Sequence, residues 1–256
     1  MMKRQITVEV CVDSVASAVA AERGGAQRIE LCSALLEGGV TPSLGLLSVI
    51  RSKVSIGLHA IIRPRPGDFS YSEAEFEIMR RDLELAKTEG ADGVVLGLMK
   101  SNGRVDVERT RELVQQARPL SVTFHRAFDL SVNLDEALED VCATGADRLL
   151  TSGGEQECSQ GVDTIARLVQ AADDRITIMA GGRIRSNNVL QIVERAGVSE
   201  IHVGLATPTR RADFYQHSRV SLGRAEDRAF EWTQVREESV RDLIRALSQA
   251  AEAGGD

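Results

Sequence analysis

A repeated helix–glycine–strand pattern constrains the fold of this chain more than any other feature. In four segments an alanine-containing helical stretch ends at a glycine and an apolar strand follows; these glycines are Gly25, Gly90, Gly145 and Gly197. Glycine readily adopts the left-handed backbone conformation that closes the C-terminus of a helix. Each of these glycines therefore marks a predicted passage from a helix into a strand.

Further strand-like runs lie between the repeats, and together they predict eight strands. The predicted strands start near Val8, Arg28, Gly57, Val94, Ser121, Arg148, Ile176 and Glu200. Strands that alternate with helices form parallel βαβ units, and eight such units in 256 residues fit an α/β fold with a single (β/α)₈ barrel of the TIM type. The rival is a doubly wound open sheet, which usually carries a glycine-rich loop after its first strand; the segment CVDSVASA is not such a loop.

The chain is expected to form one domain over residues 1–256, because no linker rich in proline or serine divides it. Residues 207–232, after the eighth strand, are polar and rich in arginine, and we expect them to form a long loop over the mouth of the barrel. The segment VREESVRDLIRALSQAAEA has helical periodicity and is predicted to close the ring as the last helix.

Composition excludes several classes of partner. The formal net charge is −7 and no basic run occurs, so a nucleic acid or an anionic membrane has no electrostatic footprint here. No apolar stretch reaches spanning length, and the first residues lack the apolar region of a signal peptide. Four cysteines in a chain this long do not make a disulfide framework. We expect a cytosolic protein with reduced thiols.

Polar residues recur on one face of the first two strands. Alternation places Glu9 and Cys11 on the face opposite the valines of the first strand, and it places Glu30 and Cys32 on one face of the second. In (β/α)₈ barrels the active site forms at the C-terminal ends of the strands, where such side chains converge.

Five charged or titratable residues are predicted to form a site at this mouth: Glu9, Glu30, Arg63, His125 and Arg126. The alternative is a structural network of buried charges that pair with one another. A set this dense favours a functional site, because perturbed ionisable groups cluster at such sites. We expect Arg63 and His125 to be the partners of the two carboxylates.

Cys11 and Cys32 occupy matching positions on neighbouring strands, which lie ~4.8 Å apart in a sheet. Two thiolates at that spacing suit a soft ion, and sulfur ligands select Cu(I) over hard cations. Two alternatives remain open, namely buried cysteines that act as small hydrophobic residues and a disulfide, which a cytosolic location disfavours. Cys142 is expected to pack in a helix, and Cys158 is expected to be exposed on a loop.

The turn after the seventh strand suggests an anion site. Gly181 and Gly182 precede a predicted helix start, with Arg183 beside them. A helix N-terminus and free backbone N–H groups suit a phosphate or another anion. The alternative is a plain tight turn between strand and helix. His202, on the eighth strand, is an open case between core and site, whereas His59 is expected in the core.

Seven motifs in order resemble the CutC family of copper homeostasis proteins: EVCVDSVASAVAAERGGAQRIELCS, LEGGVTPSLGLL, IIRPRPGDFSYS, DGVVLGL, VTFHRAFD, RLLTSGG and IMAGGRI. The resemblance runs from about Thr7 to Ala206. It implies a (β/α)₈ barrel, a cytosolic location and a role in copper tolerance or handling. In the animal members of the family, Cu(I) binding is attributed to two cysteines that map onto Cys11 and Cys32.

Three functions are therefore considered. The first is Cu(I) binding through Cys11 and Cys32. The second is an enzyme acting on a small anionic or phosphorylated metabolite, with Glu9 or Glu30 as general base, His125 as general acid, and Arg63 or Arg126 as the anion clamp. The third is a scaffold barrel, which predicts an empty, apolar mouth. A Schiff-base aldolase is disfavoured because strands five to seven carry no lysine. Barrels of this type often self-associate, so we expect a homo-oligomer.

Overall fold

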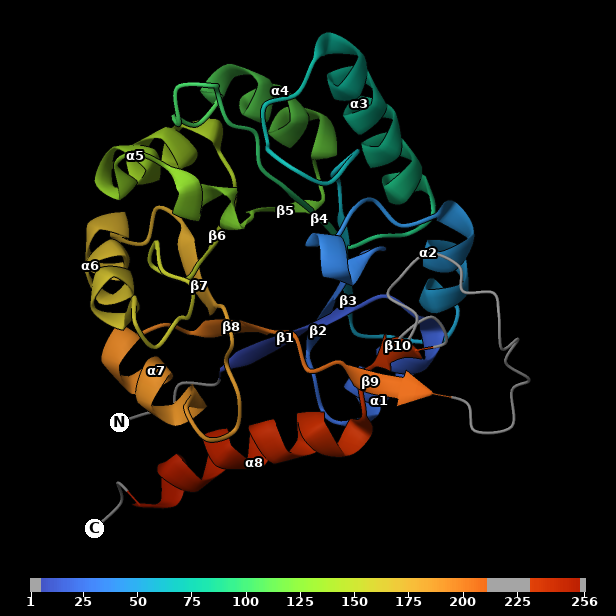
Figure 1. Cartoon of the computed structure of the whole chain (residues 1–256), viewed down its shortest axis with the longest axis vertical. Coiled ribbons are helices and arrows are strands. Elements are labelled where there is room, and N and C mark those ends of the chain that lie inside the picture. The colour runs from blue at the N-terminus through green and yellow to red at the C-terminus, as the bar shows by residue number, and fades with distance from the viewer. Residues whose placement is uncertain (1–5, 211–230, 254–256) are drawn as a thin grey trace, which may run out of the picture.

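The computed structural model describes residues 6–210 and 231–253. Within these residues, eight parallel strands close into a barrel in which β1 pairs with both β2 and β8. Helices surround the barrel on the outside (Figure 1). The predicted (β/α)₈ barrel of the TIM type is confirmed.

The observed strands begin within one residue of the predicted starts. Their bounds are β1 Thr7–Val12, β2 Arg28–Leu31, β3 Gly57–Ile61, β4 Gly93–Leu96, β5 Ser121–Phe124, β6 Arg148–Thr151, β7 Thr177–Gly181 and β8 Glu200–Val203. The helices are α1 Val15–Arg23, α2 Leu44–Arg51, α3 Glu73–Thr88, α4 Val107–Ala117, α5 Leu134–Thr144, α6 Val162–Ala172, α7 Val189–Ala196 and α8 Glu237–Ala253. Two short 3₁₀ helices, η1 Leu35–Glu37 and η2 Arg126–Leu130, follow β2 and β5.

The four repeat glycines all adopt the left-handed conformation, with φ of +98° at Gly25, +85° at Gly90, +83° at Gly145 and +70° at Gly197. Gly145 and Gly197 are themselves the C-caps of α5 and α7. The repeat therefore reports real helix ends, and this is why the strand starts were predicted so closely.

The apolar core lies between the barrel and its ring of helices. Val8, Val10 and Val12 of β1 point outward into it and are at most 1% exposed. On the helical side, residues such as Phe76 and Leu83 of α3 are at most 2% exposed. The opposite face of the strands fills the inside of the barrel, and there the sequence places Glu9, Arg28 and Glu30 instead of the branched apolar residues usual in this fold.

The segment after β8 departs from the expected loop. Residues 207–232 were predicted as one loop, but Thr207–Arg210 form β9 and pair antiparallel with β10, Glu231–Gln234. Residues 211–230, the middle of the predicted loop, lie outside the described residues. Helix α8 then packs against α1 and α7, as Figure 1 shows. Among the described helices none has the length and apolar character needed to cross a membrane.

Candidate functional site

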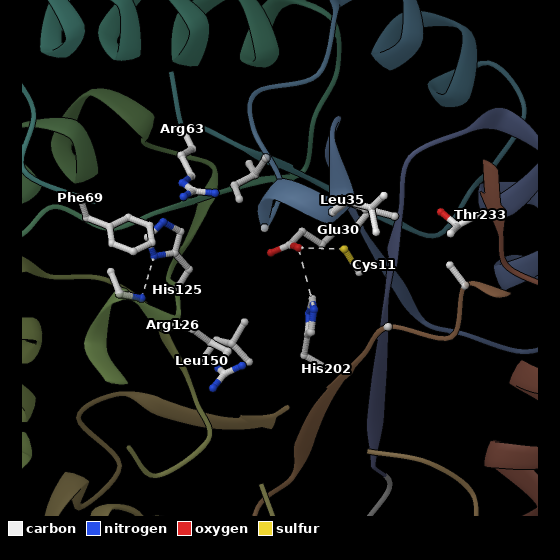
Figure 2. A pocket seen from close by; sticks show the side chains of 16 residues that line it. Cys11, Glu30, Leu35, Arg63, Phe69, His125, Arg126, Leu150, His202 and Thr233 are labelled. Carbon is white, nitrogen blue, oxygen red and sulfur yellow. Dashed lines mark hydrogen bonds and ion pairs between the residues drawn. The ribbon is translucent and has the colours of Figure 1, made fainter. Parts of the chain in front are cut away.

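A cavity of ≈ 390 Å³ opens at the C-terminal ends of the barrel strands. Its walls include five of the predicted site residues, Cys11, Glu30, Arg63, His125 and Arg126, together with His202. Figure 2 shows these side chains in two sets that face each other across the cavity: Cys11, Glu30 and His202 on one side, and Arg63, Phe69 and His125 on the other.

Of the two predicted cysteines, Cys11 lies at the first wall and Cys32 is buried behind it. The expectation of matching strand positions is wrong, because the register pairs Cys11 with Glu30, and Cys32 follows the last residue of β2. The Sγ atoms of Cys11 and Cys32 are 3.7 Å apart, and both thiols are free. Cys11 Sγ also donates to Glu30 Oε2 at 3.3 Å, and Cys32 Sγ donates to the carbonyl oxygen of Val12 at 3.6 Å.

These contacts favour the protonated form of the Cys11 thiol. The hydrogen bond to Cys32 and burial raise the pKa of Cys11 well above its usual value, and the nearby Glu30 adds to the effect. Burial likewise raises the pKa of Glu30. A positive ion between these groups would reverse this preference, because ligating thiols lose their protons to a metal.

Glu9 has partners other than the expected ones. It forms an ion pair with Arg28 Nε, and its Oε1 lies 2.7 Å from His202 Nδ1. Although burial opposes the ionised form, the His202 hydrogen bond and the Arg28 charge hold the pKa of Glu9 well below its usual range. The expectation that Arg63 and His125 pair with the carboxylates is wrong, because the register of β1 brings Arg28 and His202 directly beside Glu9.

Arg28, Glu200 and Arg148 continue the same network toward the N-terminal end of the barrel. Arg28 Nη2 donates to Glu200 Oε2 at 2.5 Å, and Arg148 Nε donates to the same oxygen at 2.6 Å. Sequence reasoning overlooked these residues because each is the first residue of its strand, at the end of the barrel opposite the predicted site. The signal was nevertheless present, since alternation puts Arg28 on the face of Glu30, and Glu200 on the face of His202.

His202 connects the buried network to the cavity. Its Nδ1 faces Glu9, and its Nε2 lies 3.9 Å from Glu30 Oε2. Burial opposes protonation, but the charges and hydrogen bond of Glu30 and Glu9 raise the pKa of His202. Ligand atoms of Cys11, Glu30 and His202 all lie within 4.8 Å of one another, close enough to hold one metal ion.

The opposite wall carries a neutral imidazole. His125 Nδ1 accepts a hydrogen bond from the backbone N–H of Ala127 at 3.3 Å, at the start of η2. Burial, and then the charge of Arg63, lower the pKa of His125 to about 3. At neutral pH the ring proton therefore sits on Nε2, and within the described residues this buried atom has no hydrogen-bond partner. His125 thus presents an uncommitted neutral N–H donor.

Arg63 is a buried cation that no carboxylate neutralises within the described part of the chain. Its Nη1 donates to the carbonyl oxygens of Glu37 at 3.0 Å and Gly39 at 2.8 Å, and its Nη2 donates to Gly67 O at 2.9 Å. The guanidinium also lies 4.8 Å from the centre of the Phe69 ring. A buried positive charge without a carboxylate partner attracts an anion to the cavity.

Arg126, in contrast to Arg63, has a carboxylate partner among the described residues. Its Nε pairs with Asp129 at 2.8 Å, and its Nη2 donates to Ser152 Oγ at 2.5 Å. It lines the cavity from this tethered position.

The predicted anion turn lies apart from the cavity walls. Gly181 ends β7, Gly182 has φ of +114°, and exposed Arg183 pairs with Glu157 at 2.7 Å. Helix α7 begins only at Val189, so residues 183–188 separate the glycines from its N-terminus. An anion site at this turn stays a prediction.

The other two cysteines have structural surroundings. Cys142 is half-buried and packs against the core, as expected. The predicted exposure of Cys158 is wrong: the residue is 0% exposed, because its loop folds back and its N–H donates to Gly182 O at 2.9 Å. Burial raises the pKa of Cys158 to about 12, so this thiol is inert at neutral pH.

Known proteins are similar to this chain in sequence and in fold. Residues 6–207 match the CutC family. A family protein CutC from Chromobacterium violaceum is 44% identical over 95% of this chain and 97% of its own length. A copper homeostasis protein cutC homolog from Homo sapiens is 46% identical over 84% of this chain and 79% of its own length.

Solved structures of related fold are also similar to this chain. The crystal structure of CutC from Streptococcus agalactiae matches with a TM-score of 0.73 and 30% identity, over 77% of this chain and 98% of that one. Phosphoribosylanthranilate isomerase from Thermotoga maritima matches with a TM-score of 0.59 at 13% identity over 96% of this chain and 100% of that one, a likeness of fold alone. The chain belongs to the CutC family.

Proposed function

We propose that this protein serves copper homeostasis in the cytosol by holding Cu(I) between Cys11 and Cys32. The observation that carries the proposal is the 3.7 Å separation of the two Sγ atoms, with Cys11 at the wall of the cavity and Cys32 buried directly behind it. Sulfur ligands select Cu(I). The human and mouse relatives, each named a copper homeostasis protein cutC homolog, support the same assignment.

The thiol pair is close to the geometry that an ion needs. Two metal–sulfur bonds of about 2.3 Å span at most ~4.6 Å in a straight line. At 3.7 Å the pair holds an ion in a bent arrangement, and a small shift of one side chain makes it straight. Because Cys11 begins as a protonated thiol, Cu(I) binding releases protons.

A competition titration tests the proposal. Reduced protein is titrated with Cu(I) against a chelator of known affinity, and Cys11→Ser and Cys32→Ser are compared with wild type. Each substitution is expected to weaken binding by at least tenfold. Cys142→Ser is the control, because this half-buried thiol belongs to α5 and packs away from the cavity. Wild-type affinity in both site variants rules the proposal out.

A second candidate function is an enzyme that acts on a small anionic metabolite. It is favoured by two features of the wall opposite the thiols, namely the unneutralised charge of Arg63 and the free Nε2–H of His125. Glu30, with its raised pKa and its place across the cavity, suits the role of general base. Glu9 is less suited, because it lies below the cavity wall in an ion pair with Arg28.

Binding of small carboxylates and phosphates tests this second function. A ligand that occupies the cavity is expected to raise the midpoint of thermal unfolding. His125→Asn keeps an acceptor for the Ala127 N–H, but the shorter side chain places no donor at the position of Nε2–H, so it is expected to abolish the shift. Arg81→Met, at an exposed site on α3, is the control. A shift that is equal in wild type and His125→Asn excludes this cavity as the anion site.

A further inference from the structure

Three side chains that line this cavity, one of them Cys11 of the cysteine pair, have atoms that could ligate a metal ion. Cys11 Sγ, Glu30 Oε2 and His202 Nε2 come from β1, β2 and β8, and they lie within 4.8 Å of one another. Two of the three separations are 3.3 Å, from Cys11 to Glu30, and 3.9 Å, from His202 to Glu30. Ligand atoms around a tetrahedral ion at bond lengths of about 2.0–2.3 Å are roughly 3.3–3.8 Å apart. The trio therefore approaches the geometry of three corners of a tetrahedron.

The outer contacts of the trio are also those of a metal site. Glu9 Oε1 lies 2.7 Å from His202 Nδ1, and Arg28 holds Glu9 in turn. A carboxylate at one ring nitrogen fixes the orientation of the imidazole, and it leaves the other nitrogen free to ligate. In this protein the free nitrogen is Nε2, which faces Glu30 and the cavity.

Charge decides which kind of ion suits the trio. One thiolate and one carboxylate carry two negative charges, so a divalent cation leaves the buried site neutral, whereas a monovalent cation leaves it negative. Burying net charge is costly. The mixed sulfur, nitrogen and oxygen donors are also those of zinc-type sites, in contrast to the all-sulfur pair of Cys11 and Cys32.

We propose that Cys11, Glu30 and His202 form a three-ligand site for a divalent d-block cation of the Zn²⁺ class, with the fourth position open to the cavity. Three protein ligands and one free position distinguish catalytic zinc sites from closed structural ones. Across the cavity stand the free Nε2–H of His125 and the charge of Arg63. An oxygen of a small anion fits the fourth position, with its remaining charge facing these two residues.

Co²⁺ is the probe, because it takes zinc sites and its absorption reports thiolate ligation and coordination number. Metal-free, reduced protein is expected to bind one equivalent, with a thiolate-to-metal charge-transfer band and the intense visible bands of a four-coordinate ion. Cys11→Ser is expected to remove the charge-transfer band. His202→Gln and Glu30→Gln are expected to weaken binding by at least tenfold, and Glu9→Gln by 10- to 100-fold with the band retained.

Cys32→Ser is the decisive variant, because Cys32 belongs to the Cu(I) pair but not to the trio. It is expected to lose Cu(I) and to keep the Co²⁺ spectrum. Loss of both metals assigns every ion to the cysteine pair and overturns the three-ligand site, as does the absence of stoichiometric Co²⁺ binding in wild type. Loss of Cu(I) binding in wild type with an intact Co²⁺ spectrum instead contradicts the proposed copper function alone. Retention of the Cys32→Ser fold is checked by its thermal unfolding without metal.

Discussion

The surroundings of His125 determine the protonation state of its imidazole ring. The N–H of Ala127 occupies Nδ1, Arg63 repels a second proton, and burial makes a charged ring costly. The triosephosphate isomerase histidine, a known example of a neutral imidazole held by a helix N-terminus, works by the same physics. In the present chain the result is an uncharged donor at the cavity wall.

This arrangement predicts a pH dependence of stability. The pKa of His125 falls from 6.5 to about 3 on folding, so between these values the unfolded chain binds a proton that the folded chain does not. Stability is therefore undiminished above about pH 6.5 and declines as pH drops toward 3, by up to about 1.4 kcal/mol per pH unit from this residue. His125→Asn is expected to flatten the slope by that amount, measured by denaturant unfolding from pH 4 to 8. Parallel curves for the two proteins contradict this account.

At the scale of single residues, alternation along the strands correctly predicted that Cys11 and Cys32 lie close together, although the register sets Cys11 opposite Glu30. It was not enough to find the partners of Glu9, because these depend on which residue of a neighbouring strand lies opposite, and register follows from barrel closure. The burial of Cys158 was missed for a similar reason, since its loop contacts Gly182, which is distant in sequence.

Strand β4 and the residues that follow it explain how the barrel has room for two imidazole rings. A Cβ atom at Gly93 would lie 2.5 Å from His59 Nε2, and one at Gly97 would lie 2.4 Å from His125 Nδ1. The β4 segment contributes no charged group to the site, but the missing side chains of Gly93 and Gly97 leave room for the rings of His59 and His125.

Gly97→Ala is expected to lower the free energy of unfolding by about 1–3 kcal/mol, because the added methyl group overpacks the His125 ring. Gly45→Ala is the matched control, since a Cβ there meets nothing within 4 Å. Alanine is favoured over glycine in a helix such as α2, so the control is expected to be more stable by roughly 0.5–1 kcal/mol. Equal effects of the two substitutions, measured by chemical denaturation, contradict the steric role of Gly97.

The ion-pair network inside the barrel predicts a second contrast. Arg28→Met leaves Glu9 buried with its main cationic partner removed, and we expect a loss of about 3–5 kcal/mol in unfolding free energy. Arg81→Met removes an exposed pair with Glu77 on α3, and exposed pairs contribute roughly 0–1 kcal/mol. A small loss for Arg28→Met shows that Glu9 finds compensation elsewhere.

Elements were predicted well where one pattern governs them and poorly where two segments must meet. The eight strand starts follow from local glycine and apolar patterns. The β9–β10 pair joins Thr207–Arg210 to Glu231–Gln234, and no local sequence pattern in either segment predicts that the two will pair. The late start of α7 at Val189 depends on the conformation of residues 183–188, which apolar periodicity does not encode.

As a whole molecule, the protein has an apolar shell around a charged interior. The shell supplies the burial that holds the barrel closed, and the interior carries Glu9, Arg28 and the site above them. The alternation of apolar and polar residues along the strands indicated the apolar face, whereas the charged network forms only because β1 and β8, from opposite ends of the chain, lie side by side.

Self-association is predicted at this scale. Leu130 and Val132, 65% and 74% exposed, lie on the outer surface after β5, and exposed apolar residues mark contact surfaces when they group. We expect light scattering to give the mass of a homo-oligomer, and we expect Leu130→Lys to lower that mass. A monomeric wild type contradicts this prediction without bearing on the metal sites.

X-ray absorption of the Cu(I)-loaded protein tests the central claim most directly. With copper held between Cys11 and Cys32, the first shell is expected to contain two sulfur atoms per copper in wild type and in Cys142→Ser. Cys32→Ser is expected to leave one sulfur atom or no bound copper. A wild-type shell of nitrogen and oxygen alone, or a shell that Cys32→Ser leaves unchanged, contradicts the claim.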